Sequence, residues 1–275
     1  MVSDNILFLR TPDSPDRYET TFSSTGYTTA SVSVLETAFV NGESLTQLMR
    51  RGSEHSGVII TSGRGCDAWD NAIRELQTAF SDLNDLHWRT IPFYVVGKSS
   101  ASKLIHTRSS YPDSPFAPLD IRGESTGNSE QLAQFITADF SSPPSTPLLY
   151  LTGDKNRDTL QEFLHAKGFQ LSSFQVYQTQ GSSTFAQDLK LVVEKLSNGN
   201  IWWIVFFAPS AAAFVVPFLR EHFELPSRTA RVAAIGPTTF NFLQQELGIK
   251  VDAVARKPTP DSLLAAISDA SPIDS

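Results

Sequence analysis

The chain of 275 residues has a single cysteine, Cys66. One cysteine cannot form an intrachain disulfide bond, which fits a reducing cytosol. The five histidines are scattered, without His-x-x-His or Cys-x-x-Cys spacing, so the sequence predicts no metal site. No Gly-x-Gly-x-x-Gly or Gly-x-x-x-x-Gly-Lys-Ser/Thr motif follows any predicted strand. We therefore expect no cofactor, and a nucleotide-dependent enzyme is the least favoured class.

Basic residues are fewer than acidic ones. The 22 Lys and Arg residues against 29 Asp and Glu residues give a formal net charge of −7, which disfavours nucleic acid and anionic membranes as partners. No apolar run approaches the length of a membrane span, and the run at residues 6–9 is too short for the core of a signal peptide. These features predict a cytoplasmic protein. A hydrophobic content of 40% is enough for a large core, and the length indicates two domains.

The most informative stretch is residues 232–242, Val-Ala-Ala-Ile-Gly-Pro-Thr-Thr-Phe-Asn-Phe. It predicts a short buried strand that stops at Gly236, followed by a helix opened by Thr238 and Thr239 and continuing to about residue 247. The first turn of a helix has backbone N–H groups without intrahelical partners and a positive dipole end, so it can hold an anion. The alternative is that the threonines only cap the helix.

Similar turns occur elsewhere. A near copy at residues 93–104 places Gly97, Ser99 and Ser100 after a predicted strand. Hydroxyl residues also follow the predicted strands at 57–61 and 201–207, at Ser62 and Ser210 respectively. Because the carboxyl ends of parallel strands meet at one edge of a sheet, these turns are expected to lie where ligands bind.

Strands alternate with helices along the whole chain, which predicts doubly wound parallel sheets. Residues 30–37 and 169–179 are each expected as one continuous extended run, residues 121–126 as a connection, and a helix is expected from Asp67 to about residue 83. The pattern also repeats in order. Residues 6–37 match 148–179, residues 58–69 match 205–214, and residues 93–104 match 233–243.

The ordered set of motifs resembles the uroporphyrinogen-III synthase family of tetrapyrrole (haem) biosynthesis. The resemblance covers residues 6–267 and is carried best by Thr61-Ser62-Gly63-Arg64, Val176-Tyr177-Gln178-Thr179, Ala234-Ile235-Gly236-Pro237-Thr238-Thr239 and Pro258-Thr259-Pro260. It implies an α/β fold with two flavodoxin-like domains joined by a two-stranded connector and an active site in the cleft between them. Residues 1–36 and 180–275 are then one discontinuous domain and residues 37–179 the other. The crossings fall near residues 32–37 and 174–179.

The resemblance further implies a cyclising hydro-lyase. The family converts the linear tetrapyrrole hydroxymethylbilane to uroporphyrinogen III, with inversion of the last pyrrole ring and loss of water. The substrate carries an acetate and a propionate on every pyrrole, so it requires many donors for anions. A monomer is expected. The alternative from another class is a non-catalytic two-lobed binding protein for a polyanionic small molecule.

Tyr177 is the candidate catalytic residue, because a phenol keeps its proton at neutral pH and can donate it to a departing hydroxyl. The matching position in the first copy of the repeat is Leu35, so the repeat does not require an aromatic residue there. Arg64 and Arg157 could pair with carboxylates bidentately, or could be solvated surface residues. The candidate substrate-binding residues are Thr61, Ser62, Arg64, Gly97, Ser99, Ser100, Gly153, Arg157, Ser210, Gly236, Thr238 and Thr239.

Overall fold

The computed structural model describes residues 4–52, 54–77, 87–156, 158–196 and 201–270. The contacts divide the chain into two compact units. The terminal unit comprises Met1–Glu36 and Gln180–Ser275, and the central unit comprises Thr37–Thr179. No helix among the described residues is long and apolar enough to cross a membrane.

The terminal unit is built on a five-stranded sheet in the order β12-β11-β10-β1-β2, with every neighbouring pair parallel. Its elements are β1 (Asn5–Leu9), α1 (Arg17–Ser24), β2 (Thr28–Val32), α7 (Phe185–Lys195), β10 (Trp202–Phe206), α8 (Pro209–Leu219), β11 (Ala230–Ala234), α9 (Pro237–Gln245), β12 (Ala253–Val254) and α10 (Pro260–Ala270).

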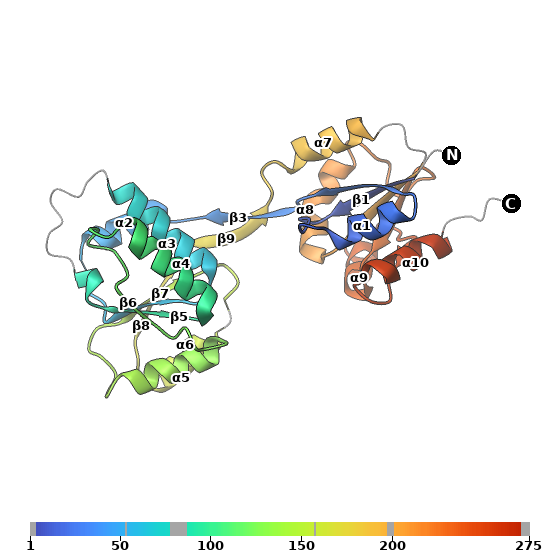
Figure 1. The fold of residues 1–275 in the computed structure, drawn as a ribbon. Helices are drawn as coiled ribbons and strands as arrows, with labels where there is room; N and C mark the ends of the chain where they lie inside the picture. The colour runs from blue at the N-terminus through green and yellow to red at the C-terminus, as the bar shows by residue number, and fades with distance from the viewer. Residues whose placement is uncertain (1–3, 53, 78–86, 157, 197–200, 271–275) are drawn as a thin grey trace. The chain divides into compact units, whose positions relative to one another are not determined.

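Alternate side chains of these strands enter two cores, one on each face of the sheet. Leu7 and Phe206 pack with α7, α8 and α9, whereas Phe8 and Val205 pack with α1 and α10. Figure 1 shows α8 and α1 on the two sides of the sheet. Since helices cover both faces, the central strands β1 and β10 are buried along their whole length, as parallel strands usually are.

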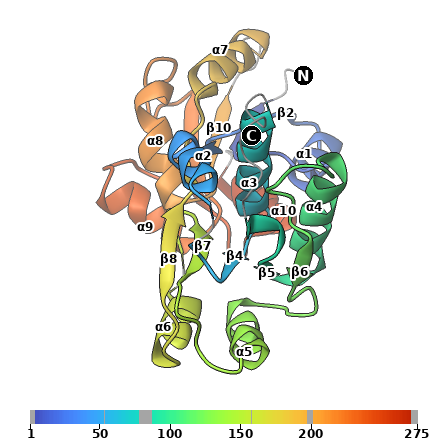
Figure 2. The ribbon, with the colours of Figure 1, turned by 90° about the vertical axis from the view of Figure 1, so that its left-hand side faces the viewer.

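The central unit has a second five-stranded parallel sheet in the order β6-β5-β4-β7-β8. Helices α2, α3 and α4 cover one face, and α5 and α6 cover the other (Figures 1 and 2). Its elements are α2 (Gly42–Arg50), β4 (Gly57–Ile60), α3 (Gly63–Leu76), the 3-10 turn η2 (His87–Arg89), β5 (Pro92–Val95), α4 (Gly97–Ser110), β6 (Asp120–Arg122), α5 (Ser129–Asp139), β7 (Leu148–Thr152), α6 (Thr159–Ala166) and β8 (Leu171–Gln175).

The two sheets have the same topology. Replacing β12, β11, β10, β1 and β2 in order by β6, β5, β4, β7 and β8 converts one strand order into the other. The α/β class with a doubly wound parallel sheet in each half and an internal repeat is therefore confirmed.

A separate two-stranded sheet pairs β3 (Leu35–Phe39) with β9 (Tyr177–Gly181), and both boundaries between the units fall inside these strands. The expected continuous runs at 30–37 and 169–179 were wrong. Each run is two strands, β2 and β3 in the first and β8 and β9 in the second. The breaks occur because each chain segment leaves a five-stranded sheet and pairs in the two-stranded one.

Two further expectations were wrong. Helix α3 begins at Gly63 rather than Asp67, because Ser62 caps it and Gly63–Gly65 form its first turn. Residues 120–122 form the edge strand β6, although they read as a connection. The expected end of α3 near residue 83 lies outside the described residues.

Candidate active site

The strand order reverses at β4 and β7 in the central unit. From β4 the chain proceeds to β5 and β6 on one side of the sheet and to β7 and β8 on the other. Open parallel sheets bind ligands beyond the carboxyl ends of the strands at such a switch point. Ile60 pairs with Leu151, so Thr61 and Gly153 leave the sheet at the same edge.

Tyr177 lies at this edge and contacts the turn after β4. The hydroxyl of Ser62 donates a 3.0 Å hydrogen bond to the phenol oxygen of Tyr177. Ser62 Oγ also accepts the backbone N–H of Gly65 at 3.2 Å, which caps α3. The Tyr177 oxygen is thus an acceptor towards Ser62, and its own proton is left for another acceptor.

Gly153 contributes by having no side chain. A Cβ atom at this position would lie 2.9 Å from the Tyr177 phenol oxygen and closer still to two carbons of its ring. The ring of Tyr177, which is only 8% exposed, therefore occupies the space beside Gly153. Gly153 shapes the site by admitting the ring.

Arg64 and Thr61 complete the contacts at this edge. The Arg64 guanidinium carbon lies 4.6 Å from the centroid of the Tyr177 ring, a cation–π distance. Arg64 is exposed and forms no ion pair with any residue in the described part of the chain. A side-chain hydrogen bond joins Thr61 to Tyr150. Burial raises the pKa of Tyr150, and this bond opposes the rise.

The turn after β5 differs from that after β4. Helix α4 follows Val96 without a side-chain cap, and Gly97 has a φ of 73°, which glycine adopts without strain. Ser99 is exposed in the first turn, whereas Ser100 is 5% exposed. Ser99 is therefore the hydroxyl of this pair that a ligand can reach.

The terminal unit has two comparable turns. Helix α8 follows Ala208 and α9 follows Gly236, and neither has a side-chain cap. Ser210 and Thr238 are exposed in the first turns, but Thr239 is 3% exposed. The explanation that these hydroxyls only cap helices therefore applies to Ser62 alone, and the first N–H groups of α8 and α9 have no side-chain acceptor.

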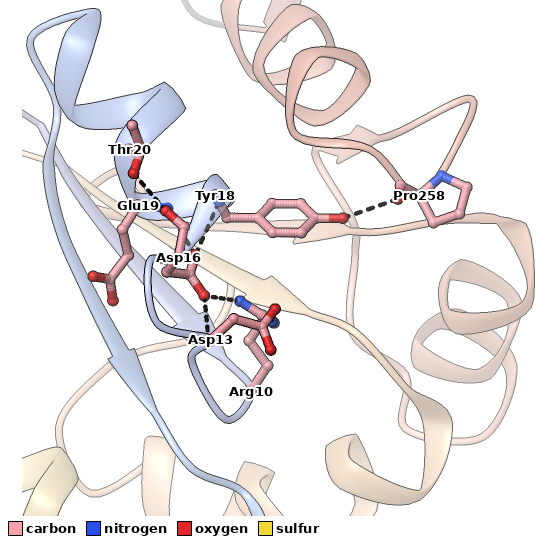
Figure 3. Close-up of polar contacts among 7 residues, drawn as sticks. All are labelled: Arg10, Asp13, Asp16, Tyr18, Glu19, Thr20 and Pro258. Atoms are coloured by element: carbon pink, nitrogen blue, oxygen red, sulfur yellow. Dashed lines mark hydrogen bonds and ion pairs between the residues drawn. The ribbon is translucent and has the colours of Figure 1, made fainter.

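A charged cluster that no sequence motif indicated lies at the end of β1 (Figure 3). Arg10 pairs with Asp16 through Nη1, and with Asp13 through Nη2 at 2.9 Å. Its guanidinium carbon lies 5.2 Å from the ring centroid of Tyr18 and 5.4 Å from that of Phe207. The sequence signal for this cluster is an arginine directly after a buried strand, but it stands in a polar segment with prolines at positions 12 and 15, a composition typical of a loop.

Asp16 holds this cluster together. Its Oδ1 accepts the N–H groups of Tyr18 and Glu19 and thereby caps α1, and its Oδ2 accepts the N–H of Asp13 at 2.9 Å. Burial acts to raise the pKa of the Asp16 carboxyl, but these backbone bonds and Arg10 hold it below its usual value. Tyr18 is tied to the segment before α10 by a 3.0 Å hydrogen bond from its hydroxyl to the Pro258 carbonyl (Figure 3).

Of the candidate residues, Thr61, Ser62, Arg64, Gly153 and Tyr177 gather at one edge of the central sheet. The turns with Ser99, Ser210 and Thr238 lie at carboxyl ends of other parallel strands. Arg157 lies outside the described residues. Among the described residues, no group of three or more His, Cys, Asp or Glu residues could hold a metal ion.

These features define a class: an α/β protein of two repeated units, with uncapped helix starts suited to anions and a hydrogen-bonded phenol at one switch point. The sequence model of uroporphyrinogen-III synthase HemD matches residues 16–265. The chain belongs to the uroporphyrinogen-III synthase family. Membership of an enzyme family favours catalysis over the alternative of a binding protein.

Individual relatives agree with this assignment. The uroporphyrinogen-III synthase of Saccharomyces cerevisiae is 30% identical over 217 residues, 76% of this chain and 74% of that protein. That of Schizosaccharomyces pombe is 29% identical over 264 residues, 95% of each chain. The crystal structure of uroporphyrinogen-III synthetase from Helicobacter pylori 26695 aligns with a TM-score of 0.45 and 16% identity, over 98% of this chain and 100% of that one. The assignment follows from the family model and the two yeast sequences.

Proposed function

We propose that this chain cyclises hydroxymethylbilane to uroporphyrinogen III, inverting the last pyrrole ring and releasing water, as a lyase. Family membership supports the reaction. The observation that carries the chemistry is the hydrogen bond from Ser62 to the phenol oxygen of Tyr177. It supports Tyr177 as the group that protonates the departing hydroxyl.

The direction of this bond matters. Because Ser62 supplies the proton of the shared hydrogen bond, the Tyr177 proton is available to the hydroxymethyl oxygen of the substrate. The oxygen then leaves as water when its bond to carbon breaks, with the electron pair on the oxygen. General acid assistance contributes about 10²–10⁴ in rate. An electron-rich pyrrole expels hydroxide readily, so holding the chain ends in the inverted geometry is the larger task.

The substrate's carboxylates require cationic and N–H donors. The uncapped first turns of α4, α8 and α9 offer backbone N–H groups, and Ser99, Ser210 and Thr238 add exposed hydroxyls. We assign direct contact with the substrate to these three exposed hydroxyls. The neighbouring hydroxyls of Ser100 and Thr239 are buried, so we assign them no contact. Gly97 and Gly236 let the substrate approach the backbone at these turns.

The remaining candidates have different roles in this proposal. Arg64 binds a substrate carboxylate while its guanidinium stays over the Tyr177 ring. Arg157 binds a second substrate carboxylate. Thr61 orients Tyr150, and Gly153 admits the Tyr177 ring.

We also propose that the terminal and central units are the two domains of the family, joined by β3 and β9. We expect a monomer in the cytoplasm, with no nucleic-acid or membrane partner. Sedimentation equilibrium measures the mass. Type III product formation that survives exhaustive chelation and dialysis would agree with the expected independence from metals and organic cofactors.

The decisive experiment supplies hydroxymethylbilane to the purified chain and separates the porphyrinogen isomers after oxidation. Spontaneous closure without inversion gives the type I isomer, so type III in excess of a no-protein control supports the proposal. A product mixture identical to that control refutes it. Tight binding of the substrate without conversion would instead identify a binding protein.

A further inference from the structure

Arg10 occupies the switch point of the terminal unit. The chain proceeds from β1 to β2 on one side and to β10, β11 and β12 on the other, so the strand order reverses between β1 and β10. Leu9 pairs with Phe206 at the ends of β1 and β10. Arg10 directly follows β1, and Phe207 directly follows β10. In the central unit the corresponding positions are Thr152 and Thr61, because Leu151 pairs with Ile60. Ligands of parallel sheets bind beyond such strand ends.

Two aromatic rings and one buried carboxylate fix the guanidinium. Tyr18 and Phe207 lie edge to face with a centroid distance of 5.0 Å, and the Arg10 guanidinium lies within cation–π range of both. The side chain of Asp16 is 4% exposed and that of Arg10 is 16% exposed. Asp16 therefore anchors Arg10 from the protein side.

Asp13 holds Arg10 from the solvent side. Its side chain is 72% exposed, and its 2.9 Å contact with Nη2 is the only side-chain hydrogen bond that it makes within the described chain. Exposed ion pairs contribute little to stability, because water screens both charges. The contact between Asp13 and Arg10 can therefore exchange for another carboxylate at small cost, whereas the contact with Asp16 cannot.

We propose that Arg10 is a carboxylate-binding residue of the terminal unit, and that an acetate or propionate of the substrate replaces Asp13 at its Nη2 group. The identity of the ligand rests on the proposed function. An arginine has five N–H donors in a planar fork, so Arg10 can keep Asp16 and bind a substrate carboxylate together. Asp13 then acts as a built-in competitor, which sets a threshold for binding.

The central unit offers a parallel. Arg64 lies over the Tyr177 ring at its switch point, as Arg10 lies over Tyr18 and Phe207. Each unit thus presents a guanidinium supported by an aromatic ring at the carboxyl ends of its strands. The difference is that Arg10 has carboxylate partners within its own turn. This difference yields a test, because removing a competitor should strengthen binding.

The experiment compares Asp13→Asn, Arg10→Gln and Arg10→Lys with the unmodified protein. The matched control is Asp269→Asn, which removes the same charge at an exposed position in the last turn of α10. One arm measures KM for hydroxymethylbilane from the rate of type III formation. The second measures the Kd of uroporphyrin III, a stable polycarboxylate with the substrate's side chains. Thermal melting accompanies each variant, because loss of Arg10 also leaves Asp16 without its cation.

Asp13→Asn is expected to lower KM and Kd by about two- to fivefold, the scale of an exposed ion pair. Arg10→Gln is expected to raise both about tenfold, as loss of a charged hydrogen bond does, with Arg10→Lys in between. Asp269→Asn should change neither. The inference is overturned if Asp13→Asn changes KM and Kd no more than Asp269→Asn does. If Arg10 had only a structural role, removing the Asp13 charge would not strengthen binding.

The two proposals fail separately. If the unmodified chain makes type III product but Asp13→Asn behaves like Asp269→Asn, the role of Arg10 is wrong and the proposed function stands. If the chain makes no type III product while uroporphyrin III binding responds as expected, the proposed function is wrong and the carboxylate site at Arg10 stands.

Discussion

Ser62 and Tyr177 share a 3.0 Å hydrogen bond although 115 positions separate them in the chain. Ser62 is also the residue that caps α3, through the N–H of Gly65. One hydroxyl therefore caps the start of a helix and orients the candidate acid. The arrangement leaves the Tyr177 proton directed away from Ser62, which is the geometry that a proton donor needs.

Replacing Tyr177 by phenylalanine tests this role. The ring and its packing remain, so melting should change little, and only the loss of one hydrogen bond from Ser62 is expected, about 0.5–1.5 kcal/mol. Turnover should fall by no more than about 10², the lower end of the range of general acid catalysis, because positioning is retained and an electron-rich pyrrole expels hydroxide readily. Type III formation under substrate saturation and a melting curve are the two measurements.

Ser62→Ala is the informative companion to Tyr177→Phe. It removes the helix cap, so the free energy of unfolding should fall by about 1 kcal/mol, while the Tyr177 hydroxyl is kept. Activity that is kept in Ser62→Ala but lost in Tyr177→Phe would show that the phenol proton acts without Ser62, whereas equal losses would show that the two hydroxyls act as one unit.

Gly153→Ala should damage the site through Tyr177. The new methyl group would overlap the tyrosine ring, so either the ring or the turn after β7 must shift, at about 1–3 kcal/mol. Turnover should fall together with stability. Gly42→Ala is the matched control, since a Cβ there meets nothing within 4 Å and Gly42 begins a helix. Unchanged unfolding and activity for Gly153→Ala would contradict the assigned role of Gly153.

Asp16→Asn should alter the dependence of stability on pH. The pKa of this carboxyl is held below 3.8, so its charged form favours the folded state. That contribution is present above pH 3.8 and is lost as the pH falls through the lowered pKa. The stability deficit of Asp16→Asn should thus be large at pH 7 and shrink at pH 3. Urea unfolding at both pH values measures it. A deficit independent of pH would show that loss of the oxygen that accepts the Asp13 N–H matters rather than loss of the charge, because asparagine still caps the helix.

The sequence predicted most of the fold because the buried strands are short apolar runs that end at glycine or proline. It predicted the turns after β4, β5, β10 and β11 for the same reason. It missed β6, because a polar strand of three residues at an edge has no pattern to distinguish it from a loop. It merged β2 with β3, since periodicity does not reveal when a strand changes its partner.

The candidate site was predictable one turn at a time. The contact between Ser62 and Tyr177 was not, because nothing local encodes which distant side chains meet. The role of Arg10 was not predicted for a different reason. Asp13 and Asp16 lie close to it in sequence, and such a charged segment is typical of a solvated loop. The burial of Thr239 and Ser100, beside the exposed Thr238 and Ser99, is likewise set by tertiary packing.

The last prediction ranks binding against proton transfer. The double change Thr238→Ala with Thr239→Ala should reduce activity more than Tyr177→Phe does. A hydroxyl bound to a charged group contributes about 1–3 kcal/mol, and the first turn of α9 is a place where substrate carboxylates are expected. Type III formation at several substrate concentrations separates a rise in KM from a fall in turnover.

The single variants separate binding from stability. Thr238 is exposed, so Thr238→Ala should raise KM with unchanged melting, whereas Thr239 is 3% exposed, so Thr239→Ala should lower stability first. Melting of each variant must therefore be measured before its kinetics are interpreted. If Tyr177→Phe abolishes the reaction while the double variant keeps nearly full activity, the ranking is wrong. Proton transfer by Tyr177 would then carry the catalysis, and the N–H groups of α9 would suffice for the carboxylates without either hydroxyl.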